Sequence, residues 1–306
     1  MKTIQLNRRQ FLATSAKVTI GLSASSLLLQ GCVSGDIASN LGQAVKLTET
    51  AIKVAPTVSK AFEEITPEQE YYIGRTIGAV VLNKYKPYEH KAGNSYLNIL
   101  GQTLAQFSDL PELYDGYHFQ ILDSPEINAF ATPSGLIFVT RGMLRCCNHE
   151  NGLAAILAHE IGHVQLKHGL QSIEKDRITK ATSMLAIEGT KAFAGSDLAT
   201  LTSTFEDSIN DITSTMINSG YSRAFENEAD AAAVTLLQRV GYDPSGLIDM
   251  LQLMTKQLKP GGLDFAKTHP APEDRIENLA KLISASKSQT PLLARQRRFE
   301  TAMKGV

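Results

Sequence analysis

The chain has 306 residues, of which 43% are hydrophobic and 20% are charged. This is an ordinary globular composition, and the length fits one large domain or one domain with an accessory segment. The formal net charge of −1 gives no reason to expect nucleic acid or acidic substrates as partners.

The N-terminal residues are typical of a bacterial export signal. Lys2, Arg8 and Arg9 precede a short apolar stretch at 11–29. RRQFL, beginning at Arg8, resembles the core of a twin-arginine signal, and the general export route stays open. LQGC resembles a lipobox, which implies cleavage before Cys32 and attachment of a lipid to its thiol. A transmembrane anchor is the alternative, but the stretch is short and Ser and Thr interrupt it.

The lipid would tether the mature protein to a membrane. Val33 follows Cys32, and in a Gram-negative host the absence of Asp at this position favours the outer membrane, by resemblance to other lipoproteins. We therefore expect the protein at the periplasmic face of the outer membrane. Residues 32–64 are rich in Ser, Ala, Thr and Val, and we expect them to form a tether.

Two helices and a small sheet are predicted before the central motif. A helix is predicted to start at Thr66, because Pro67 and acidic residues follow this capping residue. The helix should continue to about Tyr85. A second helix should cover roughly 94–108. Apolar and β-prone patterns predict strands, in chain order at 117–122, within 128–135 and at 135–140. After Arg141 the chain becomes helical again.

The most informative motif is HEIGH, which lies near the end of an apolar helical segment, 152–166. Residues four apart lie on one helix face, so His159 and His163 can direct two imidazoles at one zinc ion. Glu160 projects beside them, where a general base for water is needed. The motif predicts the zinc site of a metalloprotease, whose third protein ligand must come from another segment.

The segment 223–230 contains the candidate third ligand. Glu226 and Asp230 are four apart and share a helix face, whereas Glu228 is rotated by about 200° and should face elsewhere. We expect Glu226 to bind zinc and Asp230 to accept a hydrogen bond from the free N–H of a zinc-bound histidine. Arg223 lies three residues before Glu226 and should support the site from the same face.

A His-Pro pair follows further along the chain. His269 could stabilise the oxyanion of the reaction, or it could occupy the open position of zinc in a resting state. Arg275 could do the same work or pair with Asp230. His168 is five residues after His163 and should lie on a different helix face, as a cation near the last carbonyls of the helix.

Three other segments carry weaker signals. Cys146 and Cys147 are expected to be small residues near the start of the active helix, with a redox switch or a bond to another protein as alternatives. Residues 171–219 are predicted to form two helices. These helices either cover the cleft as a lid or lie on the surface without such a role. The basic residues at 295–298 predict a solvated tail, and a membrane or partner role is the alternative.

The ordered motifs resemble those of the HtpX-like and CAAX-prenyl-protease-like zinc metallopeptidases. The shared features are HEIGH, then Arg223 with Glu226 and Asp230, then THP at 268–270 with Arg275. NAFA at 128–131 and VTRG at 139–142 resemble the periplasmic branch of that family. The resemblance spans about 66–282 and departs from the family pattern at the Thr-Pro-Ser turn and at the cysteine pair.

This resemblance implies an α+β gluzincin fold, mainly helical, with a small β-sheet next to the HExxH helix. The edge strand of that sheet would hold substrate as an added strand, with Asn128 and Ala129 by the substrate backbone. His269 could cap the zinc and keep the enzyme latent. The resemblance implies one zinc ion per chain, bound by His159, His163 and Glu226. It implies that Glu160 is the general base.

The sequence therefore predicts a zinc metalloendopeptidase anchored in the bacterial cell envelope, which cleaves misfolded or envelope proteins and meets envelope assembly partners. The rival is a lipoprotein that binds misfolded proteins and uses zinc structurally, although structural sites usually have four protein ligands, often with Cys. The predicted parts are an export signal, a lipid-anchored tether, a metallopeptidase domain and a basic tail, at 1–31, 32–64, 65–286 and 287–306.

Overall fold

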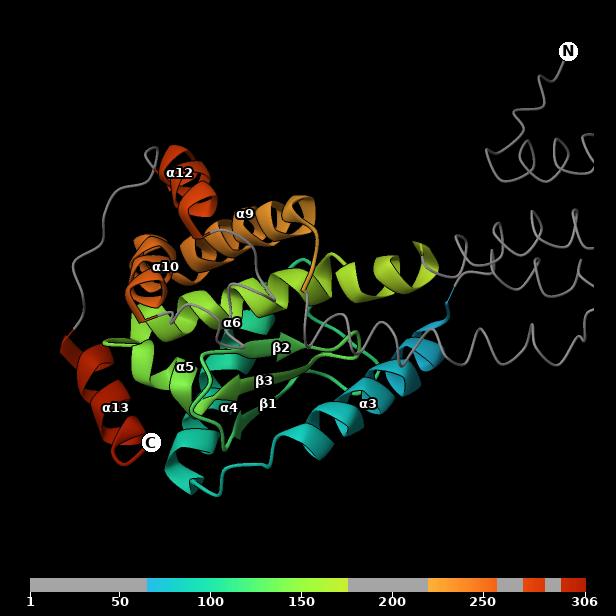
Figure 1. The fold of residues 1–306 in the computed structure, drawn as a ribbon, viewed down its shortest axis with the longest axis horizontal. Helices are drawn as coiled ribbons and strands as arrows, with labels where there is room; N and C mark the ends of the chain where they lie inside the picture. The colour runs from blue at the N-terminus through green and yellow to red at the C-terminus, as the bar shows by residue number, and fades with distance from the viewer. Residues whose placement is uncertain (1–64, 176–219, 258–271, 284–292) are drawn as a thin grey trace, which may run out of the picture. The chain divides into compact units, whose positions relative to one another are not determined.

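The computed structural model describes residues 65–175, 220–257, 272–283 and 293–306, and all of them belong to one compact unit, Val54–Val306 (Figure 1). The predictions for the export signal, Cys32, the tether, most of 171–219 and His269 lie outside the described residues. Within the described ranges, every helix is too short or too polar to cross a membrane.

The described residues form a mainly helical domain with one small sheet, as the sequence predicts. The labelled helices, in chain order, are α3 (Pro67–Lys84), α4 (Lys91–Ala105), α5 (Arg141–Cys146), α6 (Glu150–Gln165), α9 (Arg223–Val240), α10 (Ser245–Gln257), α12 (Pro272–Ile283) and α13 (Leu293–Met303), and residues 168–175 are also helical. The strands are β1 (His118–Leu122), β2 (Ala129–Ala131) and β3 (Leu136–Thr140).

The sheet has the strand order β1-β3-β2. The central strand β3 runs parallel to β1 and antiparallel to β2, so that Phe138 lies opposite Gln120 on one side and opposite Phe130 on the other. Among the described strands, β2 is therefore an edge strand, and one side of its backbone is not paired within the sheet.

Helices cover both faces of the sheet because side chains alternate along each strand. Ile137 and Val139 belong to the main core, which also contains the buried residues of α4 and α6. Phe138 belongs to a separate cluster with Val81 and Tyr85, at the end of α3. Figure 1 shows α3 and α6 on opposite sides of the sheet.

Side-chain caps fix where the helices that carry the site begin. The Thr66 side chain accepts a hydrogen bond from the backbone of Gln69, which confirms the predicted start of α3. His149 caps α6 through Nδ1, and Ser222 caps α9 through its hydroxyl. α9 ends at Gly241, whose φ of 77° is a left-handed conformation that glycine adopts without strain.

α6 is the central helix of the domain. Its residues from Gly152 to Val164 are all buried, because α4, α9, α10 and β2 surround it. Gly162 faces α9 so closely that a Cβ atom there would lie 2.9 Å from the carbonyl oxygen of Ala229. The glycine of HEIGH therefore permits the close approach that brings α9 to the two histidines.

The C-terminal segment differs from the predicted solvated tail. Residues 293–303 form α13, and its Phe299 and Ala302 are buried against the domain. Arg298 binds the carboxylate of Glu150 at the start of α6. Burial would raise the pKa of Glu150, but hydrogen bonds from Arg298, Tyr96 and Tyr242 lower it, so this carboxylate is ionised. Arg298 of the basic run is thus a partner of a buried acid.

Candidate metal centre

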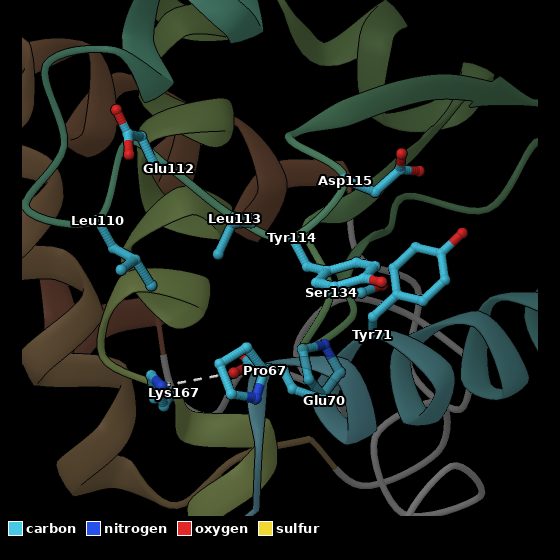
Figure 2. A pocket seen from close by; sticks show the side chains of 11 residues that line it. Pro67, Glu70, Tyr71, Leu110, Glu112, Leu113, Tyr114, Asp115, Ser134 and Lys167 are labelled. Carbon is cyan, nitrogen blue, oxygen red and sulfur yellow. Dashed lines mark hydrogen bonds and ion pairs between the residues drawn. The ribbon is translucent and has the colours of Figure 1, made fainter.

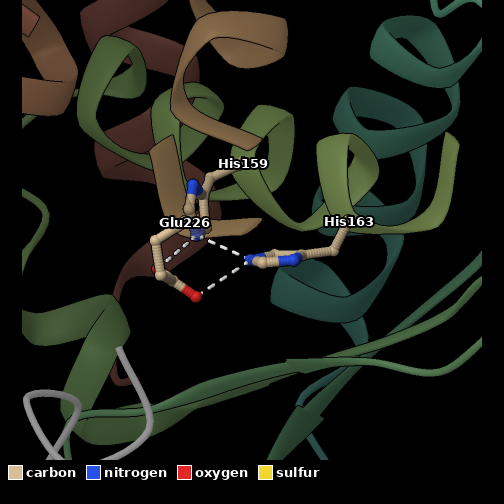
Figure 3. A group of neighbouring side chains, drawn as sticks. All are labelled: His159, His163 and Glu226. Carbon is tan, nitrogen blue, oxygen red and sulfur yellow. Dashed lines mark hydrogen bonds and ion pairs between the residues drawn. The ribbon is translucent and has the colours of Figure 1, made fainter. Parts of the chain in front are cut away.

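Three side chains from two helices converge at one point of the interior (Figure 3). His159 Nε2 lies 3.1 Å from His163 Nε2. Each of these nitrogens lies 3.4 Å from one carboxylate oxygen of Glu226. All three residues are at most 2% exposed. The spacing of four along α6 and the proximity of α9 bring together the residues that the sequence suggested as metal ligands.

The geometry of these atoms fits a zinc ion. Tetrahedral ligands about 2.0–2.1 Å from zinc lie roughly 3.3 Å from one another. The observed separations of 3.1, 3.4 and 3.4 Å match this value. Two imidazoles and one carboxylate are also a donor set that zinc accepts in catalytic sites. The residues therefore fit the metal that the sequence predicts.

A buried ion pair supports His159 from behind. Asp230 Oδ1 lies 2.9 Å from His159 Nδ1, the nitrogen that faces away from the other ligands. Arg275 binds both carboxylate oxygens of Asp230, at 2.7 and 2.8 Å, and its Nη1 lies 3.2 Å from Glu226. Of the two roles that the sequence left open for Arg275, this contact corresponds to pairing with Asp230.

The protonation of the cluster reflects an excess of negative charge. Burial and Arg275 lower the pKa of His159, but hydrogen bonds with Asp230 and Glu226 outweigh them and raise it to about 9. Burial would raise the pKa of Asp230, but Arg275 and His159 hold it well below its usual range. A buried imidazole that keeps its proton at neutral pH marks a place where a divalent cation is favourable.

Glu160 lies beside the metal ligands on α6 and is 1% exposed. It lines a small cavity together with His159, Met250 and Arg275. Its charge contributes to the raised pKa of Arg275, which places the carboxylate close to the same cluster. A buried carboxylate in this position can exchange a proton with water or substrate at the metal centre.

The position of Arg223 corrects the sequence-based expectation that it supports the metal ligands. Its side chain is 73% exposed and forms an ion pair with Asp274 of α12, at 3.2 Å. Arg223 is the first residue of α9, and both it and Ala224 are exposed. Helical spacing put it on the correct face but could not show that the long side chain turns outward to an acid on another helix.

His168 also differs from the expectation of a cation at the end of a helix. It is fully buried, and burial lowers its pKa against the opposing effect of Glu228, so the imidazole is neutral. Its Nδ1 lies 2.9 Å from Nδ1 of His163. The prediction failed because α6 ends at Gln165 and does not continue through His168.

Asn128 and Ala129, the predicted substrate-backbone residues, lie where β2 begins at the sheet edge. Asn128 is 3% exposed, and its Oδ1 accepts a hydrogen bond from the backbone N–H of Ala129 at 2.9 Å. The backbone N–H of Asn128 donates to Thr140, so the start of β2 is fixed to β3. β2 also packs against α6, the helix that carries both histidines.

The two neighbouring cysteines are buried and form no disulfide. Burial raises the pKa of Cys146 to about 11, and burial and the neighbouring thiol raise that of Cys147 further. Both thiols donate to backbone carbonyls one helical turn earlier. This agrees with the expectation of small buried residues, because a protonated buried thiol is inert as a nucleophile or ligand.

Two cavities lie near the ends of the site helices. One of about 270 Å³ lies between α9 and α12 and reaches Glu226 and Arg275. The other, of about 100 Å³, is lined by residues of α3, of the 110–115 segment and of the turn after β2 (Figure 2). There Glu70 forms an ion pair with Lys167, which connects α3 to the chain just after α6.

Sequence reasoning missed Tyr221 and gave His168 another role. The ring of Tyr221 stacks on His163, with centroids 4.4 Å apart and an interplanar angle of 21°. Tyr221 precedes the cap of α9, so its place against α6 depends on tertiary packing that no local spacing reports. The burial of His168 depends on a break in the helix at Lys167, for which the sequence offers no strong turn signal.

Comparison with known proteins agrees with this geometry. Residues 91–283 match peptidase family M48. The beta-barrel assembly-enhancing protease of Yersinia pestis is 28% identical over 216 residues, which are 66% of this chain. The mitochondrial metalloendopeptidase OMA1 of Schizosaccharomyces pombe is 32% identical over 53% of this chain, and the metalloprotease LoiP of Escherichia coli is 26% identical over 55%.

The matched segments cover only part of these relatives. They span 42% of the Yersinia pestis protein, 45% of the Schizosaccharomyces pombe protein and 63% of the LoiP protein. The chain therefore spans less than two thirds of the length of each.

Proposed function

Since this chain belongs to peptidase family M48, we propose that it acts as a zinc-dependent endopeptidase. The observation that carries this proposal is the convergence of His159, His163 and Glu226 with zinc-like spacing, beside the buried carboxylate of Glu160. Two relatives are named as a metalloendopeptidase and a metalloprotease, which supports the same reaction class.

The residues of the chain divide the work of peptide hydrolysis. When bound, zinc supplies a Lewis acid that polarises the peptide carbonyl and makes water more acidic. Glu160 accepts a proton as water attacks the carbonyl carbon, and it then delivers that proton to the leaving amine. Asp230 accepts the Nδ1–H of His159 and so fixes the ring that presents Nε2 to the metal. Arg275 balances the charges of Asp230 and Glu226.

The substrate is an extended polypeptide that pairs with the edge strand β2. In an antiparallel ladder, every second residue directs its N–H and C=O away from the partner strand. Asn128 and Thr132 bond to β3 through their backbone, so the backbone groups of Ala129 and Ala131 point toward the open edge, where Asn128 Oδ1 already accepts a hydrogen bond from the N–H of Ala129. This edge favours unfolded or misfolded protein, because folded proteins rarely present an unpaired extended segment.

A structural zinc site in a binding protein is the rival function. Such sites usually have four closed protein ligands, often cysteines. Among the described residues, the ligand set is two histidines and one glutamate, while Cys146 and Cys147 bond to carbonyls of their own segment. The ligand chemistry therefore favours catalysis over a structural role.

We further propose a subfamily, a lipid anchor and a cellular location for the chain. We assign it to the HtpX-like and CAAX-prenyl-protease-like group, as a lipoprotein that Cys32 anchors to the periplasmic face of the outer membrane. The beta-barrel assembly-enhancing protease from Yersinia pestis supports an envelope setting and assembly partners. The proposed boundaries are an export signal to residue 31 and a tether to 64, and the domain extends beyond 286 to include α13.

His269 is proposed as the residue that regulates the site. Its side chain, outside the described residues, would take the remaining position on zinc and keep the enzyme latent until substrate displaces it. The variant His269→Ala should then cleave faster than the unaltered chain while keeping its metal. Equal rates for the two proteins would contradict the latency.

The proposed reaction is tested with the full chain purified in detergent. Its metal content and its cleavage of unfolded casein are measured before treatment, after removal of metal with a chelator, and after zinc is returned. We expect one zinc per chain, loss of cleavage with the chelator and recovery with zinc. Bound zinc without cleavage, in both the unaltered chain and His269→Ala, would instead support the structural-zinc rival.

A further inference from the structure

The two metal-facing imidazoles have different partners behind them. His159 Nδ1 faces the carboxylate of Asp230 at 2.9 Å, an arrangement common behind metal-binding histidines. His163 Nδ1 instead faces Nδ1 of a third imidazole, that of His168, also at 2.9 Å. His168 is fully buried and lies outside the group of atoms that converge on the metal position.

A break in the helix after α6 brings the side chain of His168 next to His163. The helix ends with the Leu166 N–H bonded to the carbonyl of Gly162. Lys167 then adopts a left-handed conformation with φ of 56°, and a new helix begins at His168. In a continuous helix, two residues five apart would point to different faces. A non-glycine residue in this conformation is uncommon, and here it allows His168 to contact His163.

The other side of His168 is held by α9. Its Nε2 lies 3.1 Å from a carboxylate oxygen of Glu228, and its ring stacks on Phe225 with centroids 4.3 Å apart and planes 6° from parallel. α9 therefore supplies the metal ligand Glu226 and, two residues later on another face, the acid that orients His168.

We propose that His168 is a positioning residue for the metal, and that Glu228, His168 and His163 form one oriented hydrogen-bond chain. This inference rests on the proposed metal site. Once Nε2 of His163 binds the metal, its Nδ1 must carry the hydrogen and donate it. His168 accepts that hydrogen at Nδ1, so its own hydrogen lies on Nε2 and is donated to Glu228. Each tautomer in the chain follows from its neighbour.

This arrangement fixes the direction of the His163 ring without placing another negative charge beside it. A neutral imidazole accepts the hydrogen bond, and the Glu228 carboxylate stays one residue further away, where its side chain is 56% exposed. The two histidines of the motif are thus oriented by different chemistry, an ion pair behind His159 and a neutral relay behind His163.

The test compares two substitutions of His168 in the full chain. His168→Leu keeps much of the volume but removes the acceptor, whereas His168→Asn keeps an acceptor close to the position of Nδ1. Zinc affinity is measured by competition with a chromogenic chelator, and the unfolding temperature of the metal-free protein is measured alongside. We expect about 10- to 100-fold weaker zinc binding for His168→Leu and recovery of most of that loss in His168→Asn.

The outcomes separate this inference from the proposed function. Wild-type affinity in His168→Leu would overturn the positioning role, as would equal losses in both variants together with an equal fall in the metal-free unfolding temperature. Zinc binding that depends on the acceptor, in a chain that cleaves no protein, would leave the positioning role standing and remove the peptidase proposal. An unaltered chain that binds no zinc would overturn both.

Discussion

Arg275 is the residue on which the charge balance of the metal centre depends. It is 4% exposed and contacts both Asp230 and Glu226. Burial lowers the pKa of a guanidinium, but these carboxylates raise the pKa of Arg275 above its ordinary value, so it stays charged. Among the described residues, Arg275 and a protonated His159 are the positive charges that face these two acids.

Replacing Arg275 by Met should destabilise the metal-free protein by about 3–5 kcal/mol, because it leaves buried carboxylates uncompensated. The loss should be smaller in the zinc-loaded protein, since the metal supplies positive charge to the same acids. Denaturant unfolding with and without a chelator measures both values. Arg223→Met is the matched control, and its exposed ion pair should contribute no more than about 1 kcal/mol. Equal losses with and without zinc would contradict the shared role.

Single residues also show where sequence reasoning succeeds and where it stops. Spacings of four within one helix survive folding, so the sequence correctly aligns His159 with His163 on α6 and Glu226 with Asp230 on α9. Arg223 and His168 do not follow the same rule. A long exposed side chain can choose an acid on another helix, and a left-handed residue can end a helix that the apolar pattern continues. Neither event leaves a mark in local spacing.

At the scale of elements, α13 shows how a basic segment becomes part of the core. Arg298 and the hydroxyls of Tyr96 and Tyr242 surround the carboxylate of Glu150, which is 1% exposed. The run of basic residues resembled a solvated tail because the buried acid that Arg295 and Arg298 face, Glu150, lies far away in the sequence.

The variant Arg298→Met should lower stability by about 1–3 kcal/mol, because one charged partner of a buried acceptor is lost. Arg297, exposed on the same helix, supplies the control: Arg297→Met should leave the unfolding temperature almost unchanged. Calorimetry at neutral pH gives the comparison. If both variants unfold at the wild-type temperature, α13 does not stabilise the domain through Glu150.

Glu70 connects α3 to the end of α6 and should make stability depend on pH. Burial raises its pKa from about 4.5, against the opposing effect of Lys167. Because the pKa is raised in the folded state, the protonated form of Glu70 favours folding. This contribution to stability is fully present below pH 4.5 and is lost as the pH rises through the folded pKa. The glutamine of Glu70→Gln cannot ionise. The loss of the ion pair with Lys167 should cost little stability, because the Lys167 side chain is half-exposed.

The unfolding temperature of Glu70→Gln, relative to wild type, should therefore increase as the pH is raised from about 4 to 8. Thermal melts across this range test the sign. A difference that stays constant or falls with rising pH would mean that the ionisation of Glu70 does not oppose folding.

At the scale of the whole molecule, the sequence predicts the α+β class, the strands and the helix order well. These features depend on local periodicity, caps and turns, which the chain carries plainly. The strand order β1-β3-β2, the pairing of α6 with α9 across Gly162 and the packing of α13 depend on contacts between distant residues. Family resemblance could imply some of this arrangement, but residue patterns alone could not.

Because the metal ligands come from α6 and α9, zinc should stabilise the domain as a whole. Free zinc at 100 times its dissociation constant adds about 2.7 kcal/mol to the free energy of unfolding. For a domain of this size, that corresponds to a rise of roughly 5–10 °C in unfolding temperature. The shift should disappear in His159→Ala. A zinc-dependent rise that persists in this variant would place the stabilising metal elsewhere.

Whether Glu160 is the base of a zinc peptidase can be decided by one paired measurement. Wild type and Glu160→Gln are purified in the same way, and zinc content and casein cleavage are measured on each sample. We predict one zinc per chain in both proteins and a fall of about 10²- to 10⁴-fold in cleavage for the variant. A variant that keeps its zinc and cleaves at the wild-type rate would show that Glu160 is not the base.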